Sequence, residues 1–125
     1  EMKLIFSMNR LSREIHENNK AKGFYDEGKN IGEILALIHS EVSEALEAHR
    51  SGNVLRECPD VDVESDEEFK TLFEAHVKDS FNDELADVII RVLDLAGYLE
   101  IDIESHVKAK VRYNTLRPRK HGKKY

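Results

Sequence analysis

The chain has 125 residues and a mass of 14.4 kDa, with 40% hydrophobic residues, 35% charged residues and a formal net charge of −6. That length predicts one domain with a single hydrophobic core. No apolar run approaches the roughly 18 residues that a membrane-spanning helix needs, which excludes a transmembrane protein. The single cysteine, Cys58, excludes a disulfide framework and a multi-cysteine zinc site.

The first residues, from Glu1 to Leu4, mix charged and apolar side chains and do not follow the pattern of a secretion signal. We therefore expect a cytoplasmic protein that has no membrane partner.

The charge is concentrated in two parts of the sequence. Eight of the 19 basic residues and none of the 25 acidic ones lie between Lys108 and Tyr125, which leaves a net charge of −14 on the rest of the chain. A solvated tail and an anion-binding tail both fit this pattern. Domains that bind nucleic acid are usually basic overall, so we expect no nucleic-acid partner.

Apolar residues recur at helical spacing along most of the chain, and strand-like alternation is nearly absent, which predicts an all-α protein. We expect a single domain over residues 1–125, with an insert or linker at 53–81 and a basic tail at 115–125. The expected helices, in chain order, cover about 3–20, the stretch from a cap at Asn30 to Ser51-Gly52, 69–77, the stretch from a cap at Asn82 or Asp83 to Gly97, and 101–114. The last but one is apolar around much of its girth and should be central.

Two of these helices carry a pair of acids three residues apart, Glu41 with Glu44 and Glu84 with Asp87. Residues at this spacing lie on one face of a helix. Both pairs are embedded in apolar sequence, and a carboxylate buried there is costly unless it is paired or binds a metal. Mg²⁺ and Mn²⁺ prefer such oxygen ligands.

The alternative is that these acids are ordinary surface residues of amphipathic helices, and the spacing alone leaves this open. Other metal and nucleotide motifs are missing: none of the six histidines follows a glutamate at the di-iron spacing, and there is no phosphate-binding glycine loop. Arg91 and Asp94 continue the second acidic face, either as an inner ion pair that orients the ligands or as an ordinary pair within the helix.

The segments Gly32–Glu47 and Asp83–Arg91, together with the C-terminal pattern Lys108, Tyr113-Asn114, Arg117-Pro118 and His121-Gly122, resemble the MazG-like all-α nucleoside triphosphate pyrophosphohydrolases. The three blocks occur in the order found in that family and cover most of residues 22–122.

The resemblance implies an enzyme that hydrolyses a nucleoside triphosphate to the monophosphate and pyrophosphate. It implies Mg²⁺ held by four acids, a four-helix core, and a homodimer or homotetramer that completes the bundle. The metal ligands implied are Glu41, Glu44, Glu84 and Asp87.

The residues themselves suggest further roles. Glu41 or Glu44 could accept a proton from the attacking water. Lys108 and Arg117, with Asn114 between them, could hold the substrate phosphates. Phe24 and Tyr25 could stack on the base, or they could instead fill the space between the first two helices.

A second function class stays open, a non-catalytic helical module that binds a nucleotide or a protein. Two departures from the family pattern favour it. Ser40 stands where the family often has a further acid, and the insert between the two acidic motifs is long.

Overall fold

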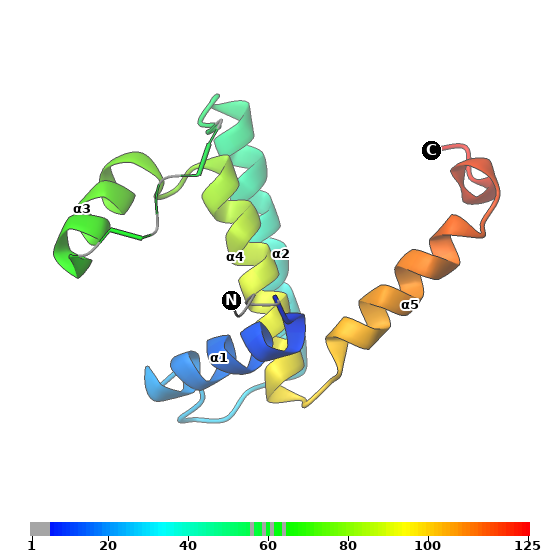
Figure 1. Ribbon diagram of the computed structural model, residues 1–125, viewed down its shortest axis with the longest axis horizontal. Coiled ribbons are helices and arrows are strands. Elements are labelled where there is room, and N and C mark those ends of the chain that lie inside the picture. Colours follow the sequence, from blue (N-terminus) through cyan, green and yellow to red (C-terminus); the bar gives the residue numbers. More distant parts are fainter. Residues whose placement is uncertain (1–5, 56, 59, 61, 64) are drawn as a thin grey trace, which may run out of the picture. The chain divides into compact units, whose positions relative to one another are not determined.

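The structure is a computed structural model that describes residues 6–55, 57–58, 60, 62–63 and 65–125. The predictions that fall on residues 1–5 and on Pro59 and Glu64 lie outside the described residues. The described residues form helices and no strands, which confirms the all-α class. The helices are α1 (Met8–Ala21), α2 (Ile31–Arg50), α3 (Asp66–His76), α4 (Phe81–Tyr98), α5 (Ile103–Thr115) and a short 3₁₀ helix (Arg119–Gly122) (Figure 1).

The chain divides into two compact units, one made of residues 28–92 and the other of residues 1–27 and 93–125. The first unit holds α2, α3 and α4 as far as Val92. The second holds α1, the end of α4 and α5. The predictions of a single domain and of a four-helix bundle stay predictions.

In the unit of residues 28–92, α2 and α4 run side by side (Figure 1). The side chain of Asn30 accepts a hydrogen bond of 3.1 Å from the backbone N–H of Glu33, which confirms the predicted cap of α2. The helix ends before Ser51, and Gly52 follows with φ of +77°. Ile34, Ala45 and Ala48 are the buried apolar residues of α2.

The predicted cap of α4 is wrong by two residues or more. The helix begins at Phe81, and the hydroxyl of Ser80 accepts a hydrogen bond of 3.1 Å from the N–H of Asp83. Ser80 is 1% exposed. The hydroxyl of Ser80 can cap the helix in this buried position, where a charged carboxylate would be costly. The helix therefore begins after Ser80, and Asn82 and Asp83 lie in its first turn.

The third helix also begins earlier than predicted. Its first residue is Asp66, because the hydroxyl of Ser65 accepts from the N–H of Glu68 at 3.3 Å. The acids Asp66, Glu67 and Glu68 therefore lie in the first turn of α3, where they stabilise the positive end of the helix dipole. The helical part of the predicted insert at 53–81 thus begins at Asp66 and not at residue 69.

In the other unit, α1 begins at Met8 in place of residue 3. The hydroxyl of Ser7 caps it by accepting from the N–H of Arg10, and Phe6 precedes the helix. Asp102 caps α5 by accepting from the N–H of Ser105, so this helix starts within two residues of the prediction. Asp102 also accepts a 2.7 Å hydrogen bond from the side chain of Asn9, which fastens α5 to α1.

Gly97 lets α1 approach the end of α4. A methyl group at this position would meet the backbone oxygen of Ser12 and the Cβ of His16, each at 2.8 Å. One contact is a backbone atom and the other is the first atom of a side chain, so neither can move aside unless the helices separate.

Gly97→Ala is therefore expected to destabilise the protein by about 1–3 kcal/mol, the usual cost of overpacking. In an open helix the same change would stabilise by about 1 kcal/mol, because alanine is the better helix former. Urea unfolding followed by circular dichroism measures the difference. An equal or higher unfolding midpoint in the variant would contradict the close approach.

Candidate metal centre

Three of the four predicted acids meet in the unit of residues 28–92. Glu41 from α2 and Glu84 and Asp87 from α4 each offer a carboxylate oxygen, and these oxygens lie within 4.8 Å of one another. Glu41 is 8% exposed and Glu84 6% exposed, while Asp87 is half-buried. The two helices thus bring together acids that are 43 residues or more apart in the sequence.

Glu44 is exposed, but it belongs to the same group. Its carboxyl lies within hydrogen-bonding reach of Glu84 and of Glu41. Four carboxyl groups from two adjacent helices therefore face one another, as the spacing of the sequence predicts.

The crowding shifts the pKa values of Glu84, Asp87 and Glu41 in different directions. Burial, with the neighbouring Glu44, Glu41 and Asp87, raises the pKa of Glu84 to about 7. Burial also raises the pKa of Asp87, with help from the charges of Asp83 and Glu41. A proton or a cation is needed to hold such a group together at neutral pH.

Glu41 has a cationic partner. Burial acts to raise the pKa of Glu41, but the hydrogen bond from Arg91, with those shared with Glu44 and Glu84, outweighs it and lowers the pKa. The Nε of Arg91 donates to Oε1 of Glu41 at 2.7 Å. Glu41 is therefore held as a carboxylate in a fixed orientation.

The expected pairing of Arg91 with Asp94 is wrong. Arg91 reaches α2, whereas Asp94 lies in the other unit, where it accepts hydrogen bonds of 3.1 Å from His16 and from Asn19 of α1. Arg91 and Asp94 each bind a residue of a different helix. An ion pair or hydrogen bond to a buried group contributes more to stability than an exposed ion pair within one helix.

A cavity of about 570 Å³ opens beside the acids. Its walls include Glu44 and Glu84 of the acidic group and Asp79 from the bend before α4. Ser43, Ser51 and Asn53 add polar atoms to it. The space is large enough for hydrated cations and part of a polar ligand.

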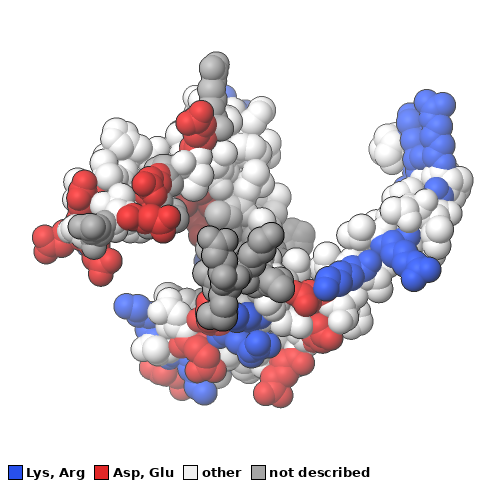
Figure 2. All heavy atoms as spheres, viewed as in Figure 1, with Lys and Arg blue, Asp and Glu red and all other residues white. Residues whose placement is uncertain are grey.

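The predicted phosphate-binding residues lie in the other unit, on or after α5. Lys108 is exposed, and its Nζ lies 3.7 Å from Oε2 of Glu104. Arg117 stands over the ring of Tyr113 at 5.7 Å and donates to the backbone oxygen of His121 at 3.5 Å. The Oδ1 of Asn114 is buried and has no hydrogen-bond partner among the residues that the structure describes. Lys and Arg side chains gather along α5 and the C-terminal end (Figure 2). The phosphate-binding role stays a prediction.

Tyr25 lies in an aromatic cluster, with its ring 4.6 Å from that of His16 and 4.9 Å from that of Tyr98. Burial and a hydrogen bond to Asp94 raise its pKa. The tyrosine thus fills space between α1 and α4, whereas the sequence predicted α1 and α2 for this role. Phe24 is 61% exposed. Base stacking by either residue stays a prediction.

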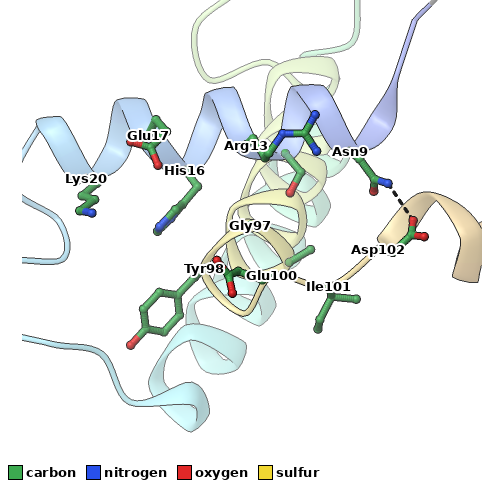
Figure 3. Close-up of a pocket in the computed structure, with 12 residues that line it drawn as sticks. Asn9, Arg13, His16, Glu17, Lys20, Gly97, Tyr98, Glu100, Ile101 and Asp102 are labelled. Carbon is green, nitrogen blue, oxygen red and sulfur yellow. Dashed lines mark hydrogen bonds between the residues drawn. The ribbon is translucent and has the colours of Figure 1, made fainter.

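The unit of residues 1–27 and 93–125 has a cavity of its own, of about 650 Å³, between α1 and the end of α4 (Figure 3). Arg13 and Lys20 line it together with Glu17, Glu100 and Asp102. Because both signs of charge are mixed around it, this cavity has no field that favours a polyanion.

Comparisons with family models, with curated proteins and with solved structures found no match. The likeness to the MazG-like family therefore rests on the three sequence blocks alone. Among the described residues, no helix is long and apolar enough to cross a membrane.

Sequence reasoning missed two acids beside the group, Asp79 and Asp83. Their oxygens lie within 4.8 Å of each other and of Glu84. For Asp83 the signal was present in the sequence, because it directly precedes Glu84, whereas Asp79 lies before the start of α4 and outside its helical pattern.

Proposed function

We propose that the protein is a Mg²⁺-dependent nucleotide pyrophosphohydrolase, which cleaves a nucleoside or deoxynucleoside triphosphate to the monophosphate and pyrophosphate. The observation that carries the proposal is the meeting of Glu41, Glu84 and Asp87, from two adjacent helices, with their oxygens within 4.8 Å. The order and spacing of the sequence blocks that resemble the MazG-like family also support it.

The donor set fits a hard divalent cation. All the donors are carboxylate oxygens, which Mg²⁺ prefers and which also suit Mn²⁺. In addition, Oε2 of Glu84 is buried and has no hydrogen-bond partner among the described residues, and a bound cation would satisfy it. Glu41, Glu44, Glu84 and Asp87 are the proposed ligands.

When bound, Mg²⁺ supplies the charge that lets a triphosphate approach four carboxylates and that stabilises the departing pyrophosphate. The protein provides the rest. Arg91 keeps Glu41 ionised and oriented. Glu44, which lines the cavity, is our candidate to accept a proton from the attacking water, and Glu41 is the other candidate.

In the reaction, the water oxygen bonds to phosphorus, the P–O bond between the α- and β-phosphates breaks, and the electron pair leaves with pyrophosphate. The proton from water passes to the glutamate. We assign the phosphates to Lys108, Asn114 and Arg117, and the base to Phe24 and Tyr25, on the strength of their chemistry.

A screen of standard and modified nucleotides, with and without Mg²⁺, tests the proposal. Pyrophosphate, and not orthophosphate, should accumulate from at least one nucleotide and only when the metal is present. If no nucleotide yields pyrophosphate, yet one gives saturable heat in calorimetry, the chain is the non-catalytic binding module.

We further propose that the chain is a homodimer or homotetramer, in which the helices of two copies complete a four-helix bundle. Several large apolar side chains of the unit of residues 28–92 face outward. Val42 is 51% exposed, Leu46 57% and Ile89 59%. Exposed apolar residues on the most apolar helices support an interface between copies of the chain, and a symmetric dimer is the commonest way to cover them.

Light scattering coupled to size exclusion should give twice or four times the chain mass at micromolar concentration. Leu46→Glu should shift the protein toward the monomer, because it places a charge in the covered surface. Ala75→Glu, on the exposed side of α3, changes the charge equally and should leave the mass unchanged. A wild-type monomer would rule out the assembly.

A further inference from the structure

The helix α3 carries an apolar stripe that stays partly open to solvent. Phe69, Leu72 and Phe73 lie three and four residues apart, so they share one face of the helix. Leu72 is 39% exposed, and Phe69 and Phe73 are half-buried with their ring centroids 5.9 Å apart. All 11 residues of α3 are described, and none of them is buried. The helix therefore lacks the surface against which an apolar face normally packs.

The helix α5, in the other unit, has a similar stripe. Val107 and Val111 lie one turn apart and are 38% and 58% exposed. Leu116, directly after the helix, is 76% exposed. All 13 residues of α5 are described, and none of them is buried. Each unit thus presents one apolar helix stripe to solvent.

The charges that border the two stripes are opposite in sign. Asp66 and Glu68 lie on either side of the stripe of α3, and Lys108 and Lys110 lie on either side of the stripe of α5. The helix α3 contains four acidic residues and one basic residue, whereas α5 contains one acidic residue and three basic ones. Figure 2 shows acidic side chains over α3 and basic ones along α5.

These charges select the partner of each stripe. Two copies of α3 packed together would place acid beside acid, and two copies of α5 would place lysine beside lysine. Like charges along an apolar seam disfavour such pairing. A pair of α3 with α5 covers both stripes and sets acids beside lysines on both edges, in either relative direction of the two helices. Charge complementarity therefore favours the mixed pair.

We infer that α3 of one copy of the chain docks on α5 of a second copy through the two apolar stripes. The inference rests on the assembly of copies proposed above. In a two-fold dimer the contact forms twice, since each copy supplies one α3 and one α5. The helix α3 belongs to the predicted insert at 53–81, so this contact gives the insert a role in assembly.

Disulfide trapping tests the contact. Two forms of the full-length chain are expressed together with different affinity tags, one with Leu72→Cys and the other with Val111→Cys. Both carry Cys58→Ser, because the native cysteine is exposed and would compete. Mild oxidation should give a disulfide-linked pair, which mass spectrometry identifies as one chain of each form. No single chain holds both new cysteines, so the mixed pair requires contact between copies.

The same trapping with Val107→Cys in place of Val111→Cys covers a shift of one turn along α5. The absence of a mixed pair at both positions would overturn the inference. Pairs of two Leu72→Cys chains that equal the mixed pair in yield would also overturn it. An internal disulfide in a chain that carries Leu72→Cys and Val111→Cys together, without a mixed pair between copies, would place the contact within one chain and reject the second copy.

Reversal of charge tests the proposed selection. Glu68→Lys, added to the Leu72→Cys chain, should lower the yield of the mixed pair by roughly twofold or more, because an attraction becomes a repulsion. Lys110→Glu in the other chain should restore the yield. Glu67→Lys is the matched control, since it changes the same charge in the same turn on the opposite face of α3. An equal loss with Glu67→Lys, or no restoration by Lys110→Glu, would contradict direct pairing of these charges.

The outcome is separable from that of the proposed function. A chain that is a dimer or tetramer in light scattering but gives no mixed pair keeps the proposed assembly and loses this contact. A chain that gives the mixed pair but releases no pyrophosphate from any nucleotide keeps the contact and loses the proposed reaction.

Discussion

Glu84→Gln is expected to reduce pyrophosphate release by about two orders of magnitude or more, because it removes a ligand to a cation whose charge stabilisation is worth several kcal/mol. Glu84 is the acid that belongs to both acidic groups. It faces Glu41 and Asp87 in one group and Asp79 and Asp83 in the next. Glutamine keeps the volume and one oxygen but removes the charge, so the variant isolates the metal interaction.

The same substitution at Glu44 is expected to lower turnover by about 10²–10⁴-fold, the range for loss of a general base. Glu44 is exposed, so its replacement should leave the stability of the protein almost unchanged. Steady-state assays of pyrophosphate release at saturating Mg²⁺ measure both effects.

Glu74→Gln serves as the control for both variants, since it removes one carboxylate from the exposed side of α3. Circular dichroism should show equal helicity in all four proteins. Wild-type activity in both Glu44→Gln and Glu84→Gln would reject the enzymatic proposal, whatever the nucleotide.

The helices could be predicted because their signals are local. The apolar stripe of α2 and its cap at Asn30 occur within a few residues of each other, and the structure confirms both. The starts of α1, α3 and α4 were misplaced, because the apolar spacing does not show which polar residue caps a helix. At α4 the burial of Ser80 determines where the helix begins, and this burial depends on the packing of the whole unit.

The candidate site could be predicted in part. Spacing along each helix shows which acids share a face, and the apolar context shows that the face is partly buried. The partner of each acid depends on which helices are adjacent. Arg91 therefore reached Glu41, 50 residues away, and not its neighbour in the sequence.

Asp79 could not have been assigned from its position in the sequence. It precedes α4 and has no place in the helical pattern. Its part in the acidic group depends on a left-handed backbone conformation and on Asn53, 26 residues earlier, which holds the bend. Such contacts follow from the fold of the unit and leave no periodic signal.

The pH dependence of stability provides an independent test of the buried acids. In the metal-free protein, Glu84 has a pKa of about 7, raised from 4.5 by burial and by Glu44 and Glu41. Between these two pH values the folded chain keeps a proton that the unfolded chain has lost. The free energy of unfolding is therefore expected to fall as pH rises from about 4.5 to 7, by at most about 3 kcal/mol, and to show no further loss from this group above pH 7.

Asp87 acts in the same direction, because its pKa is also raised. The lowered pKa of Glu41 acts in the opposite sense, but its contribution is already complete above pH 4.5 and is lost only at lower pH. The decline between pH 5 and 7 therefore reports on the acids of α4.

Urea unfolding at pH 5, 6, 7 and 8 in the presence of a chelator measures this decline. Glu84→Gln should flatten it, because glutamine has no proton to lose. Mg²⁺ should reverse it in the wild type, since the cation competes with the proton for the same carboxylate and binds more tightly as pH rises. Equal slopes in wild type and Glu84→Gln would show that Glu84 titrates normally, and a stabilisation by Mg²⁺ that is no larger at pH 8 than at pH 6 would remove Glu84 from the metal site.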